Sequence, residues 1–266
     1  MAIILGIVQG ITEPLPISSS GHLILVPWIL NWPNHTLTFD VALHGGTALA
    51  IIIYFWKDWV SLAKAFVASI KERDFSQDFN RRMIWYIIFA CLPAAIAGVL
   101  FEEKIATLLR EPTTVATLLV IMGLAMLLAD YFSSHRRILT DATLWDALII
   151  GFSQALALAP GVSRSGITIT AALLLQMNRA DAARFSFLLS GPIVTGAFLY
   201  KMLGLFFVGL PSEEVIPFLV GILVATLVGY AAISFLLGYL QKRSLKLFAY
   251  YRLAFGALIF ALLVLR

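Results

Sequence analysis

The sequence GIVQGITEPLPISSSGH, residues 6–22, decides how this chain folds. An apolar stretch that includes Gln9 and Glu13 meets two prolines and then a run of serines that ends before Gly-His22. Proline in a helix interior removes a backbone hydrogen bond and clashes with the preceding turn, so we expect the helix to break here. Polar groups inside an apolar stretch are costly in a membrane unless they are paired or hydrated. The segment therefore predicts a broken helix that carries a functional site.

The composition of the whole chain is that of a membrane protein. Apolar residues make up 61% of the 266 residues and charged residues 13%, and the mean hydropathy is +0.93. Soluble domains average roughly 45–50% apolar and about 25% charged residues. Several runs reach the roughly 20 apolar residues that a transmembrane helix needs. We predict a single all-α integral membrane domain over 1–266. The net charge of +4 then reflects the loops of a membrane protein, not a nucleic-acid partner.

The stretch 2–30 contains two helical legs, 2–13 and 21–30, that are each too short to cross a bilayer. About 12 residues at ~1.5 Å each span roughly 18 Å, against a hydrocarbon core of roughly 30 Å. Half-depth helices joined by a break are tolerated where they are buried in protein or line a wet cavity. We therefore predict a re-entrant hairpin. A single kinked span over 2–30 is the alternative.

A second broken stretch, at 144–177, matches the first when the sequence is offset by 145 positions. The offset pairs the following residues: Gly6 with Gly151, Gln9 with Gln154, Ser18 with Ser163, Ser20 with Ser165, and Gly21 with Gly166. Apolar spans follow each broken stretch, at 40–56, 83–101 and 115–132 and then at 184–207, 215–239 and 248–265. We predict two repeats, 1–132 and 144–266, each with one re-entrant hairpin plus three transmembrane helices. Because three crossings change sides, the second repeat is inverted relative to the first.

The basic residues of the loops predict the orientation of the chain. Thirteen fall on one side: Lys57, Lys64, Lys71, Arg73, Arg81, Arg82, Arg136, Arg137, Arg179, Arg184, Lys242, Arg243 and Lys246. Four fall on the other: Lys104, Arg110, Lys201 and Arg266. The first side is therefore expected to be cytoplasmic, with both termini on the outer side of a multi-pass protein.

The second break contains the sequence PGVSRSGIT, residues 160–168, with Arg164 at its centre. An arginine at membrane depth costs at least ~2.5–3.5 kcal/mol, so it needs an anion. Flanking glycines allow backbone N–H groups to turn toward a ligand, and neighbouring hydroxyls add donors, which is the chemistry of a phosphate cradle. The alternative is an ion pair between Arg164 and Glu13 that only locks the two hairpins together.

Gln9 and Glu13 are four residues apart and so share one helix face. Two oxygen ligands beside a phosphate suit a hard divalent cation, Mg²⁺ or Ca²⁺, that keeps several waters. For Gln9 the alternative is a hydrogen bond with its repeat mate Gln154.

His22 and the serines before it are candidates for phosphoryl transfer by a covalent or general-base route. His22 could equally be a packing residue, and Ser18, Ser19 and Ser20 could satisfy the backbone of the break. Asp40 and His44 form a second-tier pair on one helix face, and Asp40 could be an N-cap.

These stretches resemble the undecaprenyl-diphosphate phosphatase family of the bacitracin-resistance type. The family pattern is an acidic residue or Gln, then Glu four residues on, a Ser-rich SGH segment and later P-G-x-S-R-S-x-x-T. This chain supplies Gln9 and Glu13, the serines before His22, and 160–168. The likeness extends through 39–46, 185–192 and 251–252 and so covers the chain. Many members carry Glu at the position of Gln9, which weakens the case for Gln9 as a metal ligand.

The resemblance implies a bacterial plasma-membrane enzyme that hydrolyses a C55 polyprenyl diphosphate to the monophosphate lipid carrier and confers bacitracin resistance. It implies dependence on a divalent cation, and contacts with bilayer lipids and the lipid substrate. By this resemblance, the catalytic positions are expected to be Glu13, Ser19, His22 and Arg164. We expect substrate contacts from Ser18, Ser20, Gly161, Ser163, Ser165, Thr168, His44 and Arg252, although Arg252 could instead snorkel to an interface.

Two chemical routes and one other protein class fit the same residues. Ser19 could act as the nucleophile, assisted by His22 or Glu13, or a metal-activated water could attack directly. A transporter or flippase of an anionic polyprenyl phosphate lipid also fits, although it needs no adjoining Ser, His and Glu. The acid-phosphatase-like lipid phosphatases require a His shortly after the Arg, and none follows Arg164. The catalytic face, the oligomeric state (including a homodimer), the prenyl length, the preferred cation and any flippase activity stay open.

Overall fold

The computed structural model describes residues 1–32, 36–76, 78–209 and 211–265. Within these ranges the chain is helical, and its β-structure is one isolated bridge between Arg137 and Met177. The α-helices are α1 (Ala2–Thr12), α2 (Ser19–Ile29), α3 (Leu37–Tyr54), α4 (Trp56–Glu72), α5 (Phe79–Leu108), α6 (Pro112–Phe132), α7 (Leu144–Ala155), α8 (Arg164–Leu174), α9 (Arg179–Val208), α10 (Ser212–Leu240) and α11 (Lys246–Leu265). Two short 3₁₀ helices, η1 (Leu139–Asp141) and η2 (Leu156–Leu158), complete the order.

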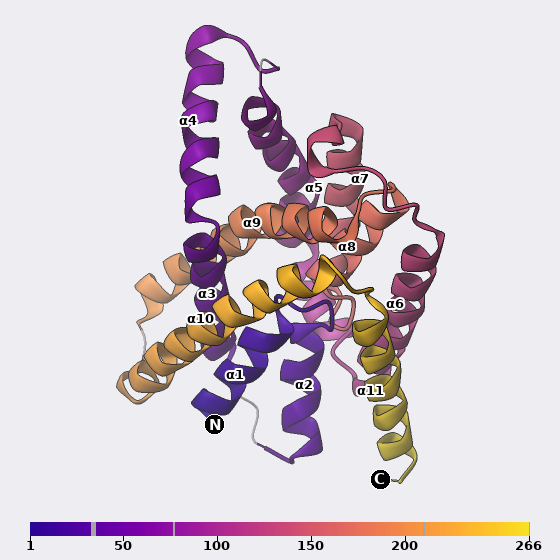
Figure 1. Ribbon diagram of the computed structural model, residues 1–266. Helices are drawn as coiled ribbons and strands as arrows, with labels where there is room; N and C mark the ends of the chain where they lie inside the picture. The colour runs from indigo at the N-terminus through magenta and orange to yellow at the C-terminus, as the bar shows by residue number, and fades with distance from the viewer. Residues whose placement is uncertain (33–35, 77, 210, 266) are drawn as a thin grey trace.

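The helices break where the prolines and glycines predict. α1 ends at Thr12, before the two prolines, and α2 begins at Ser19. Figure 1 shows these two helices lying side by side, which argues against one kinked span over 2–30. In the second half, α7 ends at Ala155 and α8 begins at Arg164. Both breaks therefore reverse or interrupt a helix in the middle of an apolar stretch.

The two breaks end in the same local structure. Ser18 and Ser163 are the N-caps of α2 and α8, with φ values of 75° and 74°, and each side chain accepts from the backbone N–H three residues on. A positive φ is uncommon for a residue other than glycine and persists only where surrounding structure enforces it. Equivalent serines thus hold an equivalent strained turn in each half.

Five of the described helices are long and apolar enough to cross a membrane: α5, α6, α9, α10 and α11. The prediction of an all-α chain with several apolar spans is therefore confirmed. The predicted span at 40–56 differs, because α3 passes the same test only together with α4, across a bend of 77°. Much of the segment between this span and the next one is helical, because α4 extends to Glu72. α4 is amphipathic and buries Leu62 and Ala65.

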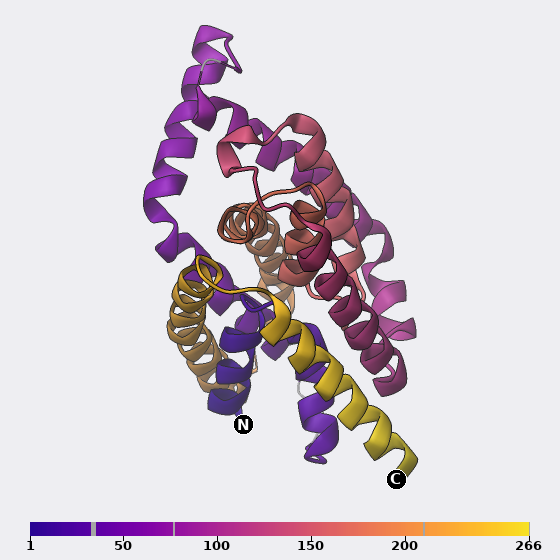
Figure 2. The ribbon, with the colours of Figure 1, turned by 45° about the vertical axis from the view of Figure 1, so that its right-hand side comes forward.

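Close helix contacts place the short helices against the long ones. α1 packs along α10, and α7 packs along α5. A Cβ atom at Gly10 would lie 2.7 Å from Val228, and one at Gly151 would lie 2.3 Å from the Ala90 carbonyl oxygen. Small residues allow such approaches in membrane proteins, where dispersion contacts drive helix association. Figure 2 shows that two of the long helices, α6 and α11, also run side by side.

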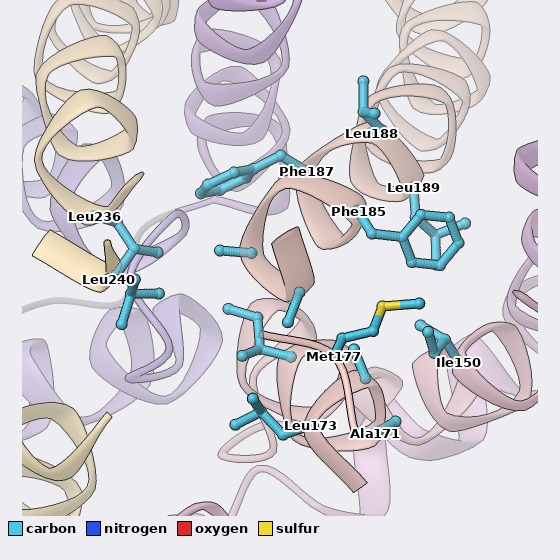
Figure 3. Close-up of a cluster of buried hydrophobic side chains, with 14 of the residues drawn as sticks. Ile150, Ala171, Leu173, Met177, Phe185, Phe187, Leu188, Leu189, Leu236 and Leu240 are labelled. Carbon is cyan, nitrogen blue, oxygen red and sulfur yellow. The ribbon is translucent and has the colours of Figure 1, made fainter. Parts of the chain in front are cut away.

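The largest apolar cluster fixes the second break to the surrounding bundle. Figure 3 shows Ile150 of α7, Leu173 of α8, Phe185 and Leu189 of α9 and Leu236 of α10 in this cluster. These side chains are buried, so moving α8 would open a cavity in a packed core. The break that carries Arg164 is thereby held on a rigid support.

Candidate active site

The two breaks touch each other directly. The Gly161 N–H donates to Ser18 Oγ at 3.1 Å, so Ser18 joins the second break as well as capping α2. In the opposite direction, Ser165 Oγ donates to the carbonyl oxygens of Leu15 (3.1 Å) and Glu13 (3.2 Å). The tips of the two breaks are therefore cross-linked by side-chain to backbone hydrogen bonds.

Arg252 of α11 bonds both breaks at the place where they meet. Its side chain is fully buried, and its guanidinium donates to the carbonyl oxygens of Pro16 (3.2 Å) and Gly161 (2.5 Å). Further bonds reach carbonyls of Val162, Leu118 and Leu119. Snorkelling to an interface is therefore wrong for this residue. Its guanidinium also bonds backbone carbonyls and not the groups around Glu13. The substrate contact expected from Arg252 is therefore not supported by the structure.

Glu13 lies at the centre of the polar cluster. Its Oε2 accepts hydrogen bonds from Ser19 Oγ and from Gln9 Nε2 at 3.3 Å. Its Oε1 lies 3.6 Å from Arg164 NH1, and its side chain is only 8% exposed. His44 Nε2 lies 3.8 Å from Oε2 on the more open side. The sequence placed Glu13 and Arg164 together, and the structure brings them into contact.

Two buried polar atoms beside Glu13 lack a hydrogen-bond partner among the described residues. They are Gln9 Oε1, an acceptor, and Arg164 NH1, a cationic donor. Buried polar groups are normally satisfied, so an unsatisfied pair next to a carboxylate is a place where a ligand would supply the missing partners. The Gln9 oxygen suits a cation, and the Arg164 nitrogen suits an anion.

The alternative partner for Gln9 is not observed. Its Nε2 donates to Glu13 and to Thr47 Oγ1 at 3.3 Å. Gln154, its repeat mate, is buried with neither amide atom bonded within the described part of the chain. Thr47 was missed by the sequence analysis. The available signal was its position on α3, three residues after His44 on the same helix face.

The hydrogen bonds of His22 go to groups other than Ser19 and Glu13. Its Nδ1 is 2.7 Å from the Ser18 carbonyl oxygen, and its Nε2 is 2.7 Å from the Tyr251 hydroxyl. Both ring nitrogens are thus occupied by groups other than the Ser19 hydroxyl. The structure favours Glu13 over His22 as the group that assists Ser19.

Most residues expected to bind substrate instead organise the two breaks. Ser18 and Ser163 cap helices, and Ser165 bonds backbone carbonyls, as described above. Thr168 Oγ1 bonds Ser186 at 2.6 Å and is fully buried. Ser20 is half-buried at 3.4 Å from Ser18 Oγ. His44, which lies 3.8 Å from Glu13, and Ser20, which lies near Ser18, both retain partial solvent exposure.

Asp40 does not cap α3, because Thr36 is its N-cap. The Asp40 carboxylate lies 3.9 Å from Arg110 NH2, and His44 Nδ1 is 2.8 Å from the Asp40 carbonyl oxygen. Asp40 and His44 therefore lie at the rim of the cluster around Glu13 and not at its centre.

Comparison with known proteins gives the family. The model of the family "Bacitracin resistance protein BacA" matches residues 2–258. The chain belongs to the BacA family. Curated relatives named "Undecaprenyl-diphosphatase" include proteins of Moorella thermoacetica (50% identical, covering 100% of this chain and 98% of the relative), Geotalea daltonii (51%, 97% and 95%) and Pelobacter propionicus (48%, 99% and 96%).

The geometry of this BacA family member defines the chemistry that the cluster can perform. A serine hydroxyl is bonded to a buried carboxylate, which can accept its proton. A guanidinium with a free donor stands on the other side of the same carboxylate. A hydroxyl, a carboxylate and a guanidinium therefore converge at one point, an arrangement that is compatible with phosphoryl transfer.

Proposed function

We propose that this protein hydrolyses undecaprenyl diphosphate to undecaprenyl monophosphate and inorganic phosphate in the bacterial plasma membrane. The names of its full-length BacA relatives support this assignment, and the family name connects it with bacitracin resistance. The observation that carries the proposal is the position of the Glu13 carboxylate between the Ser19 hydroxyl and the Arg164 guanidinium. An amphiphilic substrate suits a polar cluster enclosed by apolar helices.

In the proposed reaction, Ser19 Oγ attacks the terminal phosphorus while its proton passes to Glu13. The bond between that phosphorus and the bridging oxygen breaks, and undecaprenyl monophosphate leaves. Water then attacks the phosphoserine, which releases inorganic phosphate and restores Ser19. Arg164 NH1 donates to a phosphoryl oxygen throughout, so that its charge offsets the negative charge of the transferring group. Direct attack by a water bound at Glu13 is the competing route.

A divalent cation fits beside these groups. Gln9 Oε1 and the Glu13 carboxylate would hold it, and no cluster of three or more His, Cys, Asp or Glu side chains occurs in the described ranges. Water and phosphate oxygens would supply its other ligands, which is the arrangement that Mg²⁺ favours over an all-protein cage. When bound, the cation would neutralise charge on the diphosphate.

The Gln9→Ala variant is expected to need about tenfold more Mg²⁺ for half-maximal activity, because one of two protein oxygens is lost. Gln9→Glu should need less Mg²⁺ than the alanine variant, since a carboxylate restores an oxygen ligand. The matched control is Gln154→Ala, which removes the repeat mate, a buried glutamine that makes no hydrogen bond to Glu13 in the described structure. Equal Mg²⁺ dependence in wild type and Gln9→Ala would remove Gln9 from the metal site.

The assignment itself is tested with purified protein in nanodiscs. We expect one phosphate to be released per undecaprenyl diphosphate and none from undecaprenyl monophosphate, because only the diphosphate has an anhydride bond to break. Phosphate is measured colorimetrically and the lipid product by mass spectrometry. Binding of the lipid without phosphate release, together with its movement between leaflets, would reject the phosphatase and favour the transporter.

We further infer that the two halves are inverted repeats with re-entrant helix pairs and that both termini lie on the outer side. Support comes from the matching N-caps Ser18 and Ser163 and from the paired packing of α1 on α10 and α7 on α5. The thirteen basic residues on one set of loops, against four on the other, support the orientation.

A further inference from the structure

His22 is enclosed by aromatic rings from α11. Its imidazole stacks on Phe255, with ring centroids 4.6 Å apart and planes 10° apart. Tyr251 lies on the same stack, with its centroid 5.7 Å from the imidazole. His22 is only 4% exposed, although Tyr251 is 42% exposed. The C-terminal helix therefore builds a slot that shields His22 and sets the plane of its ring.

The hydrogen bonds of His22 determine which tautomer it holds. Nδ1 faces the Ser18 carbonyl oxygen at 2.7 Å, and a carbonyl oxygen can only accept. Nδ1 therefore carries the hydrogen, and in the neutral ring Nε2 is an acceptor. Tyr251, whose oxygen lies 2.7 Å from Nε2, must then donate its O–H to it. The Ser18 carbonyl thus selects the tautomer, and the Tyr251 hydroxyl bonds the ring nitrogen that is left as an acceptor.

The Ser18 carbonyl belongs to the strained turn immediately before Ser19. Ser18 has a φ of 75°, and its carbonyl oxygen accepts from both the backbone N–H of His22 (3.1 Å) and the ring Nδ1. A non-glycine residue keeps such a conformation only when several contacts enforce it. The ring of His22 supplies one of these contacts, and the next residue carries the hydroxyl that bonds Glu13.

We propose that Tyr251 is a positioning residue that acts through His22. Its hydroxyl holds the His22 ring against the Ser18 carbonyl, and this contact fixes the turn that aims Ser19 Oγ at Glu13. The connection runs from α11 to α2, across 229 positions of sequence. The proposal rests on the proposed role of Ser19, and it assigns His22 to the support of the nucleophile and not to proton transfer from it.

The test uses Tyr251→Phe, which keeps the stacked ring and removes only the hydroxyl. We expect kcat for undecaprenyl diphosphate to fall about tenfold, because one hydrogen bond to a buried ring is lost. KM should stay within about twofold of wild type. The matched control is Tyr250→Phe, whose 58% exposed neighbouring ring lies outside the slot and whose kinetics should not change. An unchanged kcat in Tyr251→Phe, or a rise in KM alone, would overturn the proposal.

A second measurement does not depend on activity. Nitrogen-15 NMR of histidine-labelled protein, with His22 assigned by its loss in His22→Gln, should show a protonated Nδ1 and a hydrogen-bonded Nε2. In Tyr251→Phe the Nε2 signal should move to the position of an unbonded ring nitrogen, and in Tyr250→Phe it should stay. An identical spectrum in Tyr251→Phe would rule out the contact. Absence of phosphate release by wild type would instead reject the proposed function, and the spectrum would still decide the contact.

Discussion

Replacing Arg164 with alanine is expected to lower kcat/KM for undecaprenyl diphosphate by about three orders of magnitude, the cost of removing a charged donor from a transferring phosphoryl group. Arg164 NH1 is buried and has no hydrogen-bond partner in the described structure, so its donor is available for the substrate. Its 3.6 Å distance from Glu13 is an ion-pair contact and not a hydrogen bond. The Arg164 guanidinium therefore stays beside Glu13 while its NH1 keeps a donor for the substrate.

Arg164→Lys tests whether the fork or only the charge is needed. Lysine keeps the charge but cannot bond two phosphoryl oxygens in one plane, so we expect most of the loss to remain. Arg184→Ala is the control, because Arg184 pairs with Asp58 outside the cluster and should keep near-normal turnover. If Arg164→Ala retains more than about a tenth of wild-type kcat/KM, a loss below roughly 1.4 kcal/mol, then the residue only locks the hairpins together.

Replacing Ser19 with alanine should abolish nearly all turnover, with a loss in kcat of at least about a thousandfold, because the nucleophile is gone. The helix should survive this change, since the N-cap hydrogen bond of α2 comes from Ser18 and not from Ser19. Melting temperatures of the purified variants check this point. Ser20→Ala is the matched control, because the Ser20 hydroxyl lies near Ser18 and makes no described bond to Glu13.

The outcome at Ser19 also separates the two chemical routes. With terminally ³²P-labelled substrate and an acid quench, wild type should carry label on Ser19 during turnover. Near-normal turnover of Ser19→Ala, or the absence of a labelled serine in an active wild type, would replace the serine nucleophile by a water that Glu13 activates.

The sequence was sufficient to locate the breaks and the contact between Glu13 and Arg164. Prolines and glycines interrupt helices for local reasons, and an acidic and a basic group in apolar segments need each other or a ligand. α4 could not be recognised in the same way. Its charged and apolar residues alternate around an amphipathic helix, so that a search for apolar spans passes over it.

Arg252 shows what local reasoning cannot reach. Arg164 and Arg252 are the same residue type in similarly apolar surroundings, yet one keeps a free donor and the other bonds backbone carbonyls. The difference arises from which segments pack around each side chain. The partners of Arg252 lie up to 236 positions away, and the partner of His22 lies 229 positions away. No periodicity or spacing carries that information.

The bonds from Arg252 to Pro16 and Gly161 have a consequence for movement. A carrier that works by alternating access has to rock one half of the molecule against the other. In this chain the Arg252 guanidinium bonds both breaks at once, in addition to the serine hydrogen bonds that cross-link them. Separating them would leave buried carbonyls and a buried cation without partners, at about 1–3 kcal/mol for each group. A stationary catalyst that lets its lipid enter from the side fits this construction better than a machine that opens to one leaflet and then to the other.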